Sequence, residues 1–248
     1  IQNGEGLRGI YAEGDPEMRN SHWVDEHVRR NHGPLGAGYP DANIKGIKEG
    51  DTPSFLHLLA SGLSDPEHPE WGGWGGRFQR LDERRRCYVD APDVHPSSQD
   101  ADRQMRWAVG RWNTETSNDF AARMDWCVLD YEQANHHPIP VLDGDATRDI
   151  VYREVVAGHR IQFDATNSAD PDDDTLNYRW WQYVEAGSSH CLIGFANANA
   201  NAVIASFQAP RVVERQSVHI ILSVSDEGRP SLTSHRRIIV SINPSTVN

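Results

Sequence analysis

The first 140 residues show the hydrophobic periodicity of helices that are separated by long loops. Residues 21–30 start at a serine, carry acidic residues early and end before Asn31–Pro34, which predicts a short helix. Residues 97–112 and 118–134 place apolar side chains every three or four positions and predict two further helices. The stretch 62–78 is rich in Gly, Pro and Trp, and its length and composition predict an ordered loop.

After about residue 140 the pattern changes to short β-rich runs that are separated by turn residues at regular spacing. These runs cover residues 150–152, 159–164, 176–183, 202–207, 218–224 and 237–242. They predict an antiparallel sandwich of the size of an immunoglobulin-like module. The predicted organisation is therefore a first domain over residues 1–140, a linker over 141–148 that follows Pro138 and Pro140, and a sandwich over 149–248.

The charge and the apolar pattern exclude two classes of partner. The chain has 24 Lys and Arg against 36 Asp and Glu, a net charge of −12, whereas nucleic-acid recognition needs a clustered basic surface. No apolar run approaches the roughly 20 residues that cross a bilayer. We therefore expect neither a nucleic-acid partner nor a membrane span. The three cysteines, Cys87, Cys127 and Cys191, are too few for a disulfide scaffold and lack zinc-site spacing.

The start of the chain resembles no signal peptide, because residues 1–6 contain no Met, no basic segment and no apolar segment. A chain that begins at Ile1 is expected either from processing or from truncation of a longer protein.

Two tryptophans lie on a loop that has few other side chains, in the run Trp71-Gly72-Gly73-Trp74-Gly75-Gly76. Exposed aromatic rings on such a loop can stack on a sugar or a base. The alternative is that one or both indoles plug an internal interface.

Acidic residues indicate a second candidate site. Glu49 and Asp51 follow a short β-run, which is where α/β folds place their sites. Asp119, next to Asn118 at the start of the predicted helix 118–134, can reach a metal ion. It can equally be a first-turn acid that stabilises the helix dipole.

Four strings resemble one known family: N-H-G-P-L-G-A-x-Y-P, E-G-D-T-P-S-F, D-P-E-H-P-E-W-G-G-W-G-G-R-F and N-D-F-A-A-R-M-D-W. They look like a secreted family, often labelled cellulose-binding, with a nucleoside hydrolase-like domain followed by a cadherin- or PKD-like domain. The resemblance covers nearly the whole chain. It implies an α/β fold for the first domain, together with a calcium ion that activates water. The family's early Asp-rich motif is missing, so the chain resembles the C-terminal part of such a protein.

The resemblance also implies roles for particular residues. Asn118–Ala122 is similar to the hydrolases' H-D-x-x-A, which makes Asp119 a calcium ligand and puts Asn118 at a catalytic histidine position. Glu49 and Asp51 are similar to a motif that holds sugar hydroxyls and complete the catalytic set. Substrate-binding residues within or beside the matching strings are Trp71, Trp74, Arg77 and His32.

Residues 158–180 resemble the segment between two strands of PKD and cadherin-like domains, with an acidic turn and an L-x-Y-x-W strand. Asp170, Asp172 and Asp174 in this turn can bind calcium or can simply cap the turn.

The predicted fold class is therefore the C-terminal part of a nucleoside hydrolase-like α/β domain plus an all-β immunoglobulin- or cadherin-like sandwich. The leading functional prediction is a secreted, calcium-dependent glycosidase-like hydrolase that acts on a carbohydrate or glycoside. Its catalytic Asp cluster would be completed by the N-terminal half of the same precursor, present as a separate chain. The alternatives are a non-catalytic carbohydrate-binding protein on a degenerate hydrolase scaffold and a surface adhesion module. A homo-oligomer is possible.

Overall fold

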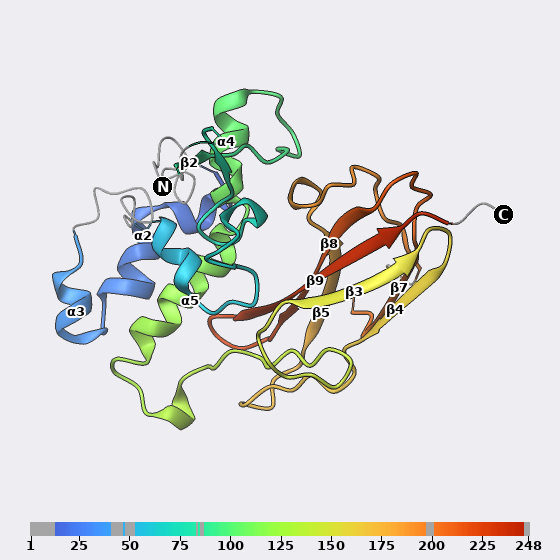
Figure 1. Cartoon of the computed structure of the whole chain (residues 1–248). Helices are drawn as coiled ribbons and strands as arrows, with labels where there is room; N and C mark the ends of the chain where they lie inside the picture. Colours follow the sequence, from blue (N-terminus) through green and yellow to red (C-terminus); the bar gives the residue numbers. More distant parts are fainter. Residues whose placement is uncertain are drawn as a thin grey trace. The chain divides into compact units, whose positions relative to one another are not determined.

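The computed structural model describes residues 13–40, 47, 53–82, 84, 87–196 and 201–245. The chain divides into two compact units, one of residues 1–59 and 64–135, the other of residues 60–63 and 136–248. The first unit consists mainly of helices and the second mainly of strands (Figure 1). Among the described residues, no helix has the length and apolar character needed to span a membrane.

The first unit is built from short helical segments around two longer helices. The longer ones are α4 (Ala101–Gly110) and α5 (Asn113–Asp125). The short segments are η2 (Pro16–Arg19), α2 (Ser21–Val24), the π-helical turn η3 (Asp25–Arg29), α3 (Gly33–Gly38), η4 (Pro53–Leu58), η5 (Pro69–Trp71) and η6 (Tyr131–Gln133). Its two described strands, β1 (Phe78–Arg80) and β2 (Tyr88–Asp90), form an antiparallel pair.

Polar side chains begin several of these helices, and an apolar stripe holds them together. Asn20 accepts a hydrogen bond from the backbone N–H of Trp23 at 2.9 Å, and Asp100 accepts one from that of Arg103 at 2.9 Å. Val24 and Val28 pack with Met124 of α5 in one buried cluster. The helices therefore derive their stability from caps and from one shared core.

The third predicted helix is shifted along the chain. It was expected over 118–134, but α5 starts at Asn113 and ends at Asp125. It starts early because the Thr116 hydroxyl donates to the Trp112 carbonyl at 2.9 Å and closes the first turn there. Asp119 therefore lies in the middle of a helix, so the prediction that it is a first-turn acid is wrong.

The second unit contains a four-stranded and a three-stranded sheet. The larger sheet has the order β3-β9-β8-β5, with β3 parallel to β9 and the other pairs antiparallel. The smaller sheet has the order β4-β7-β6 and is antiparallel. The strands are β3 (Val151–Val156), β4 (Arg160–Asp164), β5 (Asn177–Gln182), β6 (Phe195–Ala196), β7 (Ile204–Gln208), β8 (Gln216–Ser225) and β9 (Thr233–Asn243). All six strands predicted from the alternating pattern are present, and β6 is added.

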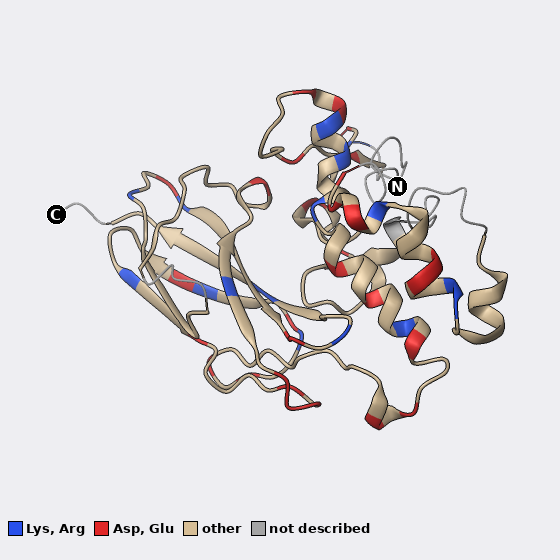
Figure 2. Cartoon of the chain, turned by 180° about the vertical axis from the view of Figure 1, so that it is seen from behind, with Lys and Arg blue, Asp and Glu red and all other residues tan. Residues whose placement is uncertain are grey.

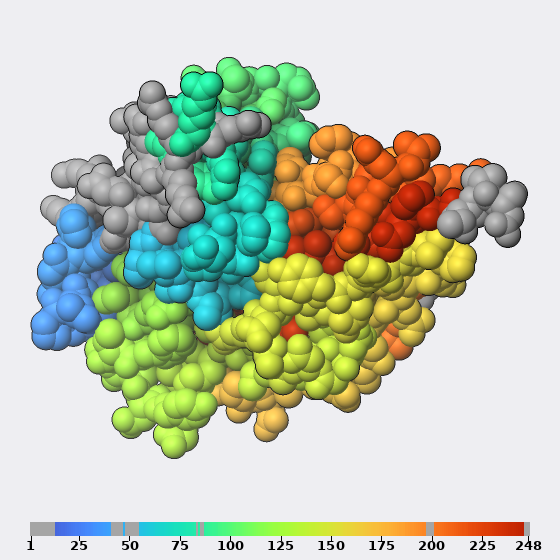
Figure 3. All heavy atoms as spheres, viewed as in Figure 1, coloured from blue at the N-terminus to red at the C-terminus, as the bar shows by residue number. Residues whose placement is uncertain are grey.

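The two sheets share one apolar core. It contains residues from β3, β8 and β9 of the larger sheet and from β4 and β7 of the smaller sheet. Phe163 and Phe207 lie across from Trp180, the predicted core tryptophan, whose ring is 6.0 Å from that of Phe163. In the space-filling view the residues around β3 and β4, drawn in yellow, form a continuous surface (Figure 3).

The segment 141–148, predicted as a linker, is built into the second unit. Leu142 is fully buried in the core that both sheets share. The Asp143 N–H donates to the Asp164 carbonyl at 2.7 Å, and Asp145 pairs with Arg236 at 2.9 Å. Pro138 and Pro140 restrict the backbone before this segment, but they do not keep the residues after them in solvent.

We predict that the second unit loses stability in mild acid through His235. Burial, with smaller contributions from His137, Arg237 and Arg179, lowers the pKa of His235 from 6.5 to about 3. Between these two values the unfolded chain binds one more proton than the folded chain, so stability falls as the pH falls. Replacing His235→Gln should remove up to about 1.4 kcal/mol per pH unit from this dependence.

Hydrogen exchange of the β8 and β9 amides at several pH values measures this slope. His159→Gln, at an exposed histidine of the same unit, is the matched control and should leave the slope unchanged. Equal slopes in wild type and His235→Gln would show that His235 is not the group responsible.

Candidate functional site

The Trp-Gly loop of the first unit has a backbone that only glycine adopts easily. Gly72 and Gly76 have φ of +73° and +89°. Gly73 and Gly76 exchange two backbone hydrogen bonds of 3.1 and 2.9 Å, which closes the loop around Trp74. A Cβ on Gly76 would lie 2.8 Å from Val109 Cγ2, so α4 packs directly against the loop. The loop is therefore ordered.

Trp71 and Trp74 have different environments. Trp74 is only 2 % exposed, so its indole fills the interior of the first unit and provides no open stacking surface. Trp71 is half-buried and stacks on His68, with ring centroids 3.9 Å apart and an angle of 8° between the planes. His68 Nδ1 lies 3.0 Å from Glu70 Oε1, and both of these side chains are 44 % exposed. We call His68, Glu70 and Trp71 the Trp71 platform.

Arg77, predicted to bind substrate, is held by the protein itself. Its Nε donates to Asp93 Oδ1 at 2.7 Å, and its guanidinium also bonds the Pro92 carbonyl. Arg111 donates to the other Asp93 oxygen at 3.0 Å. Asp93 is fully buried, and two guanidinium groups compensate its charge, as a buried carboxylate requires.

His32, also predicted to bind substrate, joins two helices of the first unit. It is 7 % exposed, and its Nε2 lies 2.9 Å from Asp125 Oδ1 at the end of α5. A Cβ on Gly36 would lie 2.7 Å from His32 Cβ, so the backbone of α3 lies close to the base of this side chain. The described contacts of His32 are therefore with the helices around it.

Asp119, which was predicted to bind a metal ion, forms an ion pair with Arg123. Arg123 donates to both oxygens of this buried carboxylate, at 2.7 and 3.2 Å. Within the ranges that the structure describes, no group of three His, Cys, Asp or Glu side chains could hold a metal. Asp119 therefore pairs with Arg123 in the structure, and the calcium site stays a prediction. Asn118 is half-buried beside Asp119 on α5, whereas Glu49 and Asp51 lie outside the described residues.

The acidic turn of the second unit is largely satisfied by its own backbone. Asp170 Oδ1 accepts from the N–H groups of Asp172 and Asp174 at 2.9 and 3.3 Å. Asp172 pairs with His136 at 3.0 Å. Partial burial and then the charges of Asp170 and Asp172 raise the pKa of Asp174. These contacts account for the acidic residues as caps of a turn.

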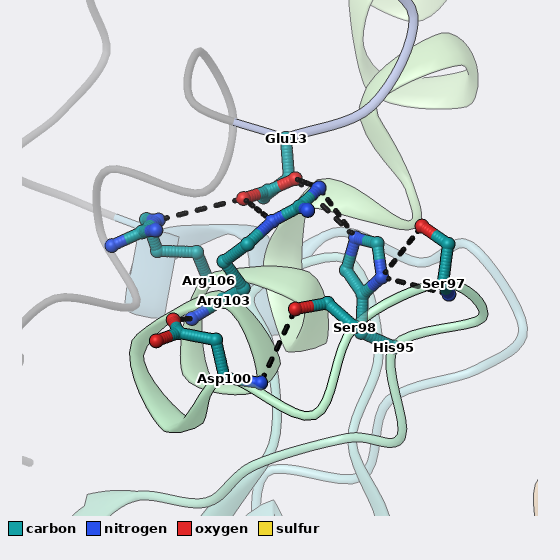
Figure 4. A network of polar contacts seen from close by, with 7 residues as sticks. All are labelled: Glu13, His95, Ser97, Ser98, Asp100, Arg103 and Arg106. Atoms are coloured by element: carbon teal, nitrogen blue, oxygen red, sulfur yellow. Dashed lines mark hydrogen bonds and ion pairs between the residues drawn. The ribbon is translucent and has the colours of Figure 1, made fainter.

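A charged cluster that sequence reasoning missed lies around Glu13 (Figure 4). Arg103 of α4 donates to both Glu13 oxygens, from Nε at 3.1 Å and from Nη2 at 3.0 Å. Arg106 lies 3.7 Å and His95 3.4 Å from the same carboxylate. Glu13 is 8 % exposed, so its charge is stabilised almost entirely by these side chains. A single glutamate near Gly14 carries no sequence signal for this role.

The hydrogen bonds fix the orientation of His95 within the Glu13 cluster. The Ser97 backbone N–H donates to His95 Nδ1 at 3.1 Å, and His95 Nε2 lies 3.1 Å from Arg103 Nη2 and 3.4 Å from the Glu13 carboxylate. The hydrogen bonds from Arg103 and the nearby His95 lower the pKa of Glu13, although burial opposes this effect. The cluster ties residue 13 to α4 and is a structural centre of the first unit.

Comparison with known proteins identifies the family. The model described as "Cellulose-binding Sde182, nucleoside hydrolase-like domain" matches residues 4–78. The model described as "Cellulose-binding protein Sde0182, C-terminal domain" matches residues 160–242. A solved structure from Saccharophagus degradans is 33 % identical over 98 % of this chain, with a TM-score of 0.78. The chain therefore matches both domain models of the Sde182 family.

The Saccharophagus degradans relative is described as a nucleoside hydrolase-related hypothetical protein that is associated with carbohydrate metabolism. The chain spans 57 % of the length of this Sde182-type relative. The match confirms the predicted resemblance to a nucleoside hydrolase-like protein with an additional C-terminal domain.

Other comparisons add little to the Sde182 assignment. The PKD domain of the KIAA 1837 protein is 18 % identical, with 40 % of this chain and 87 % of that chain covered and a TM-score of 0.28. Human CDH23 EC21-23 is 16 % identical, with 46 % and 37 % covered and a TM-score of 0.30. These two scores are too low to assign the fold of the second unit. A search of curated proteins finds no match.

We predict that the Glu13 cluster stabilises the first unit. Replacing Glu13→Gln should lower its free energy of unfolding by about 2 kcal/mol at neutral pH, because two guanidinium groups lose their charged acceptor. The folded pKa of Glu13 lies below 4.5, so its contribution is present above that value and is lost as the pH falls through the folded pKa. The difference between variant and wild type should therefore shrink in acid.

Denaturant unfolding of both proteins at neutral and acidic pH measures this difference. Glu17→Gln, at an exposed glutamate of the same unit, is the control and should change stability little. A Glu13→Gln variant as stable as wild type at neutral pH would contradict the role of the cluster.

Proposed function

We propose that this chain binds a carbohydrate of the β-glucan type through the Trp71 platform. The observation that carries the proposal is the parallel stack of Trp71 on His68, with Glu70 at hydrogen-bonding distance from the imidazole. It is supported by the cellulose-binding description of both matching family models.

The chemistry of the platform suits a sugar ring. A pyranose has an apolar C–H face and a rim of hydroxyl groups, so it needs an aromatic surface and polar groups beside it. The indole of Trp71 provides the first, and the half-exposed His68 and Glu70 provide donors and acceptors for hydroxyls. Because the loop backbone is held by glycines and by mutual hydrogen bonds, these groups are already ordered before binding.

The charge of the molecule is compatible with a neutral glycan. Acidic and basic residues are interspersed along the described ribbon of each unit (Figure 2). A neutral polysaccharide needs no electrostatic attraction, whereas a polyanion does.

The second unit fits the predicted cadherin- or PKD-like sandwich. The segment between β4 and β5 contains the acidic turn of that resemblance, and Trp180 of β5 packs against the shared core. We propose this classification on the two packed sheets, and we propose no glycan site in this unit.

The proposal has consequences for location and partners. A polysaccharide is too large to enter a cell, so binding of cellulose implies a secreted protein. The N-terminal half of the precursor as a separate chain and a homo-oligomer stay predictions.

Hydrolysis is the second candidate, and the match of residues 4–78 to a nucleoside hydrolase-like model favours it. This candidate depends on Glu49 and Asp51, which lie outside the described residues, and on a calcium ion. Calcium-dependent cleavage therefore stays the alternative to binding without cleavage.

We predict that Trp71→Ala weakens binding of cellohexaose by at least about tenfold, because it removes the stacking surface. Isothermal titration of the whole chain measures the affinity. Trp126→Ala is the matched control, since Trp126 is a half-buried tryptophan of the same unit whose Nε1 donates to the Asn135 carbonyl at 2.8 Å. Equal losses in both variants, or no loss in Trp71→Ala, would contradict the proposed site.

We also predict that the chain binds cellohexaose without cleaving it. The expected result is no release of reducing sugar above the blank, with calcium chloride or with EDTA. Release that requires calcium and is lost in Asp119→Ala would support the hydrolytic candidate.

A further inference from the structure

A short segment of the chain is hydrogen-bonded to β9 of the larger sheet of the second unit. Residues 60–63, which we call the strap, belong to this unit although both neighbouring stretches of sequence belong to the first. Arg148 donates to the Ala60 carbonyl, and the His235 N–H donates to the Ser61 carbonyl at 3.0 Å. Arg237 Nε donates to the Leu63 carbonyl at 2.7 Å. Three residues of the sheet unit therefore hold three carbonyl groups of the strap.

The strap backbone fits against β9 only because residue 62 is a glycine. Gly62 has a φ of +83°, and a Cβ at this position would lie 1.8 Å from the His235 carbonyl oxygen. Any larger residue must push the two backbones apart. A substitution at Gly62 therefore displaces the strap without changing a residue of the sheet.

Burial of the Arg237 guanidinium costs free energy. Its side chain is fully buried, its Nη1 lies 3.0 Å from His219 Nδ1, and its guanidinium lies over the Tyr183 ring at 5.5 Å. A buried guanidinium destabilises a fold unless its donors are used. Here one donor is used by a carbonyl 174 residues away in sequence, at Leu63.

The adjacent Arg236 is equally buried but has other partners. It donates to the Asp145 carbonyl at 2.6 Å and to the Asp145 carboxylate at 2.9 Å, and none of its described hydrogen bonds reaches the strap. Successive side chains of a strand point to opposite faces, which explains the difference. Arg236 is thus a natural control for Arg237.

The strap leads directly into the Trp71 platform. Only residues 64–67 separate Leu63 from His68. This connection is a tight turn, in which Asp65 accepts from the N–H of Glu67 at 2.8 Å with its side chain and from that of His68 at 3.0 Å with its carbonyl. A short, hydrogen-bonded connection has few backbone conformations. A position fixed at Leu63 therefore limits the positions that His68 can take.

We propose that Arg237 is a positioning residue for glycan binding, which holds the strap at Leu63 and thereby restricts the conformations of the Trp71 platform. This inference rests on the proposed function of the platform. Because coupling is reciprocal, a glycan on the platform must also strengthen the bond between the strap and β9.

The first test measures positioning and needs no ligand. Hydrogen exchange of residues 64–72 is compared in wild type, Arg237→Gln, Gly62→Ala and the control Arg236→Gln, all as full chains. Exchange should be about tenfold faster than in wild type in Arg237→Gln and Gly62→Ala, and it should be unchanged in Arg236→Gln. Equal exchange in Arg237→Gln and Arg236→Gln would overturn the proposal, because both changes remove a fully buried guanidinium.

The second test measures the consequence for binding. Arg237→Gln and Gly62→Ala should bind cellohexaose about tenfold more weakly than wild type, and Arg237→Lys should recover part of the loss, since an ammonium can still donate to the Leu63 carbonyl. If Arg237→Gln does not fold, the cellohexaose affinities of Gly62→Ala and Arg237→Lys test the proposal instead. In wild type, cellohexaose should slow exchange of the His235 amide.

The outcomes separate this inference from the proposed function. Normal binding by wild type, loss in Trp71→Ala and unchanged binding in Gly62→Ala would overturn the positioning role alone. Absence of binding in wild type would overturn the proposed function, and the ligand-free exchange would still show whether Arg237 orders residues 64–72.

Discussion

The candidate site depends on one backbone constraint, which is that residues 72 and 76 must adopt positive φ angles. With glycine at these positions the chain turns tightly, buries Trp74 and leaves the Trp71–His68 stack half-exposed at the start of the loop. A bulkier residue at 76 would collide with Val109 of α4, so the turn is tied to the helical core of the unit. The same constraint thus separates the buried indole of Trp74 from the half-exposed indole of Trp71, although the two residues lie in the same Gly-rich run.

Arginines that pair with buried groups form the second theme of the structure. In the first unit, Arg77 and Arg111 compensate the buried Asp93, and Arg103 with Arg106 compensates the buried Glu13. In the second unit, the buried Arg237 bonds a backbone carbonyl of the strap. Such pairs destabilise a protein when one partner is removed, but they also favour one arrangement over others. These arginines therefore set the geometry of the groups that they bond.

The sequence predicted the second unit well and the first unit poorly. Alternating apolar residues place β4, β5, β7, β8 and β9 correctly, because each of these strands contributes to one continuous core. The helices are short, and local hydrogen bonds such as that of Thr116 decide where they start, so periodicity misplaced α5 and the position of Asp119 within it.

The site was predictable only in part. The Trp-Gly composition pointed to the loop of the proposed site, but it could not distinguish Trp71 from Trp74, because their burial depends on packing against α4. The family resemblance implied ligand roles for Arg77, His32 and Asp119, whereas their partners Asp93, Asp125 and Arg123 come from other turns or elements. The Glu13 cluster and the strap join residues about 90 and more than 170 positions apart, and no local pattern predicts such pairs.

Glycan contact at the Trp71 platform is the central claim, and the indole N–H signals of the whole chain test it most directly. The chain has eight tryptophans, so the Trp71 signal is assigned by its absence in Trp71→Phe and then followed during titration with cellohexaose. The account predicts that this signal shifts in a saturable way while that of the buried Trp74 changes less. A titration in which the Trp71 signal does not move, or in which only other indoles respond, would contradict it.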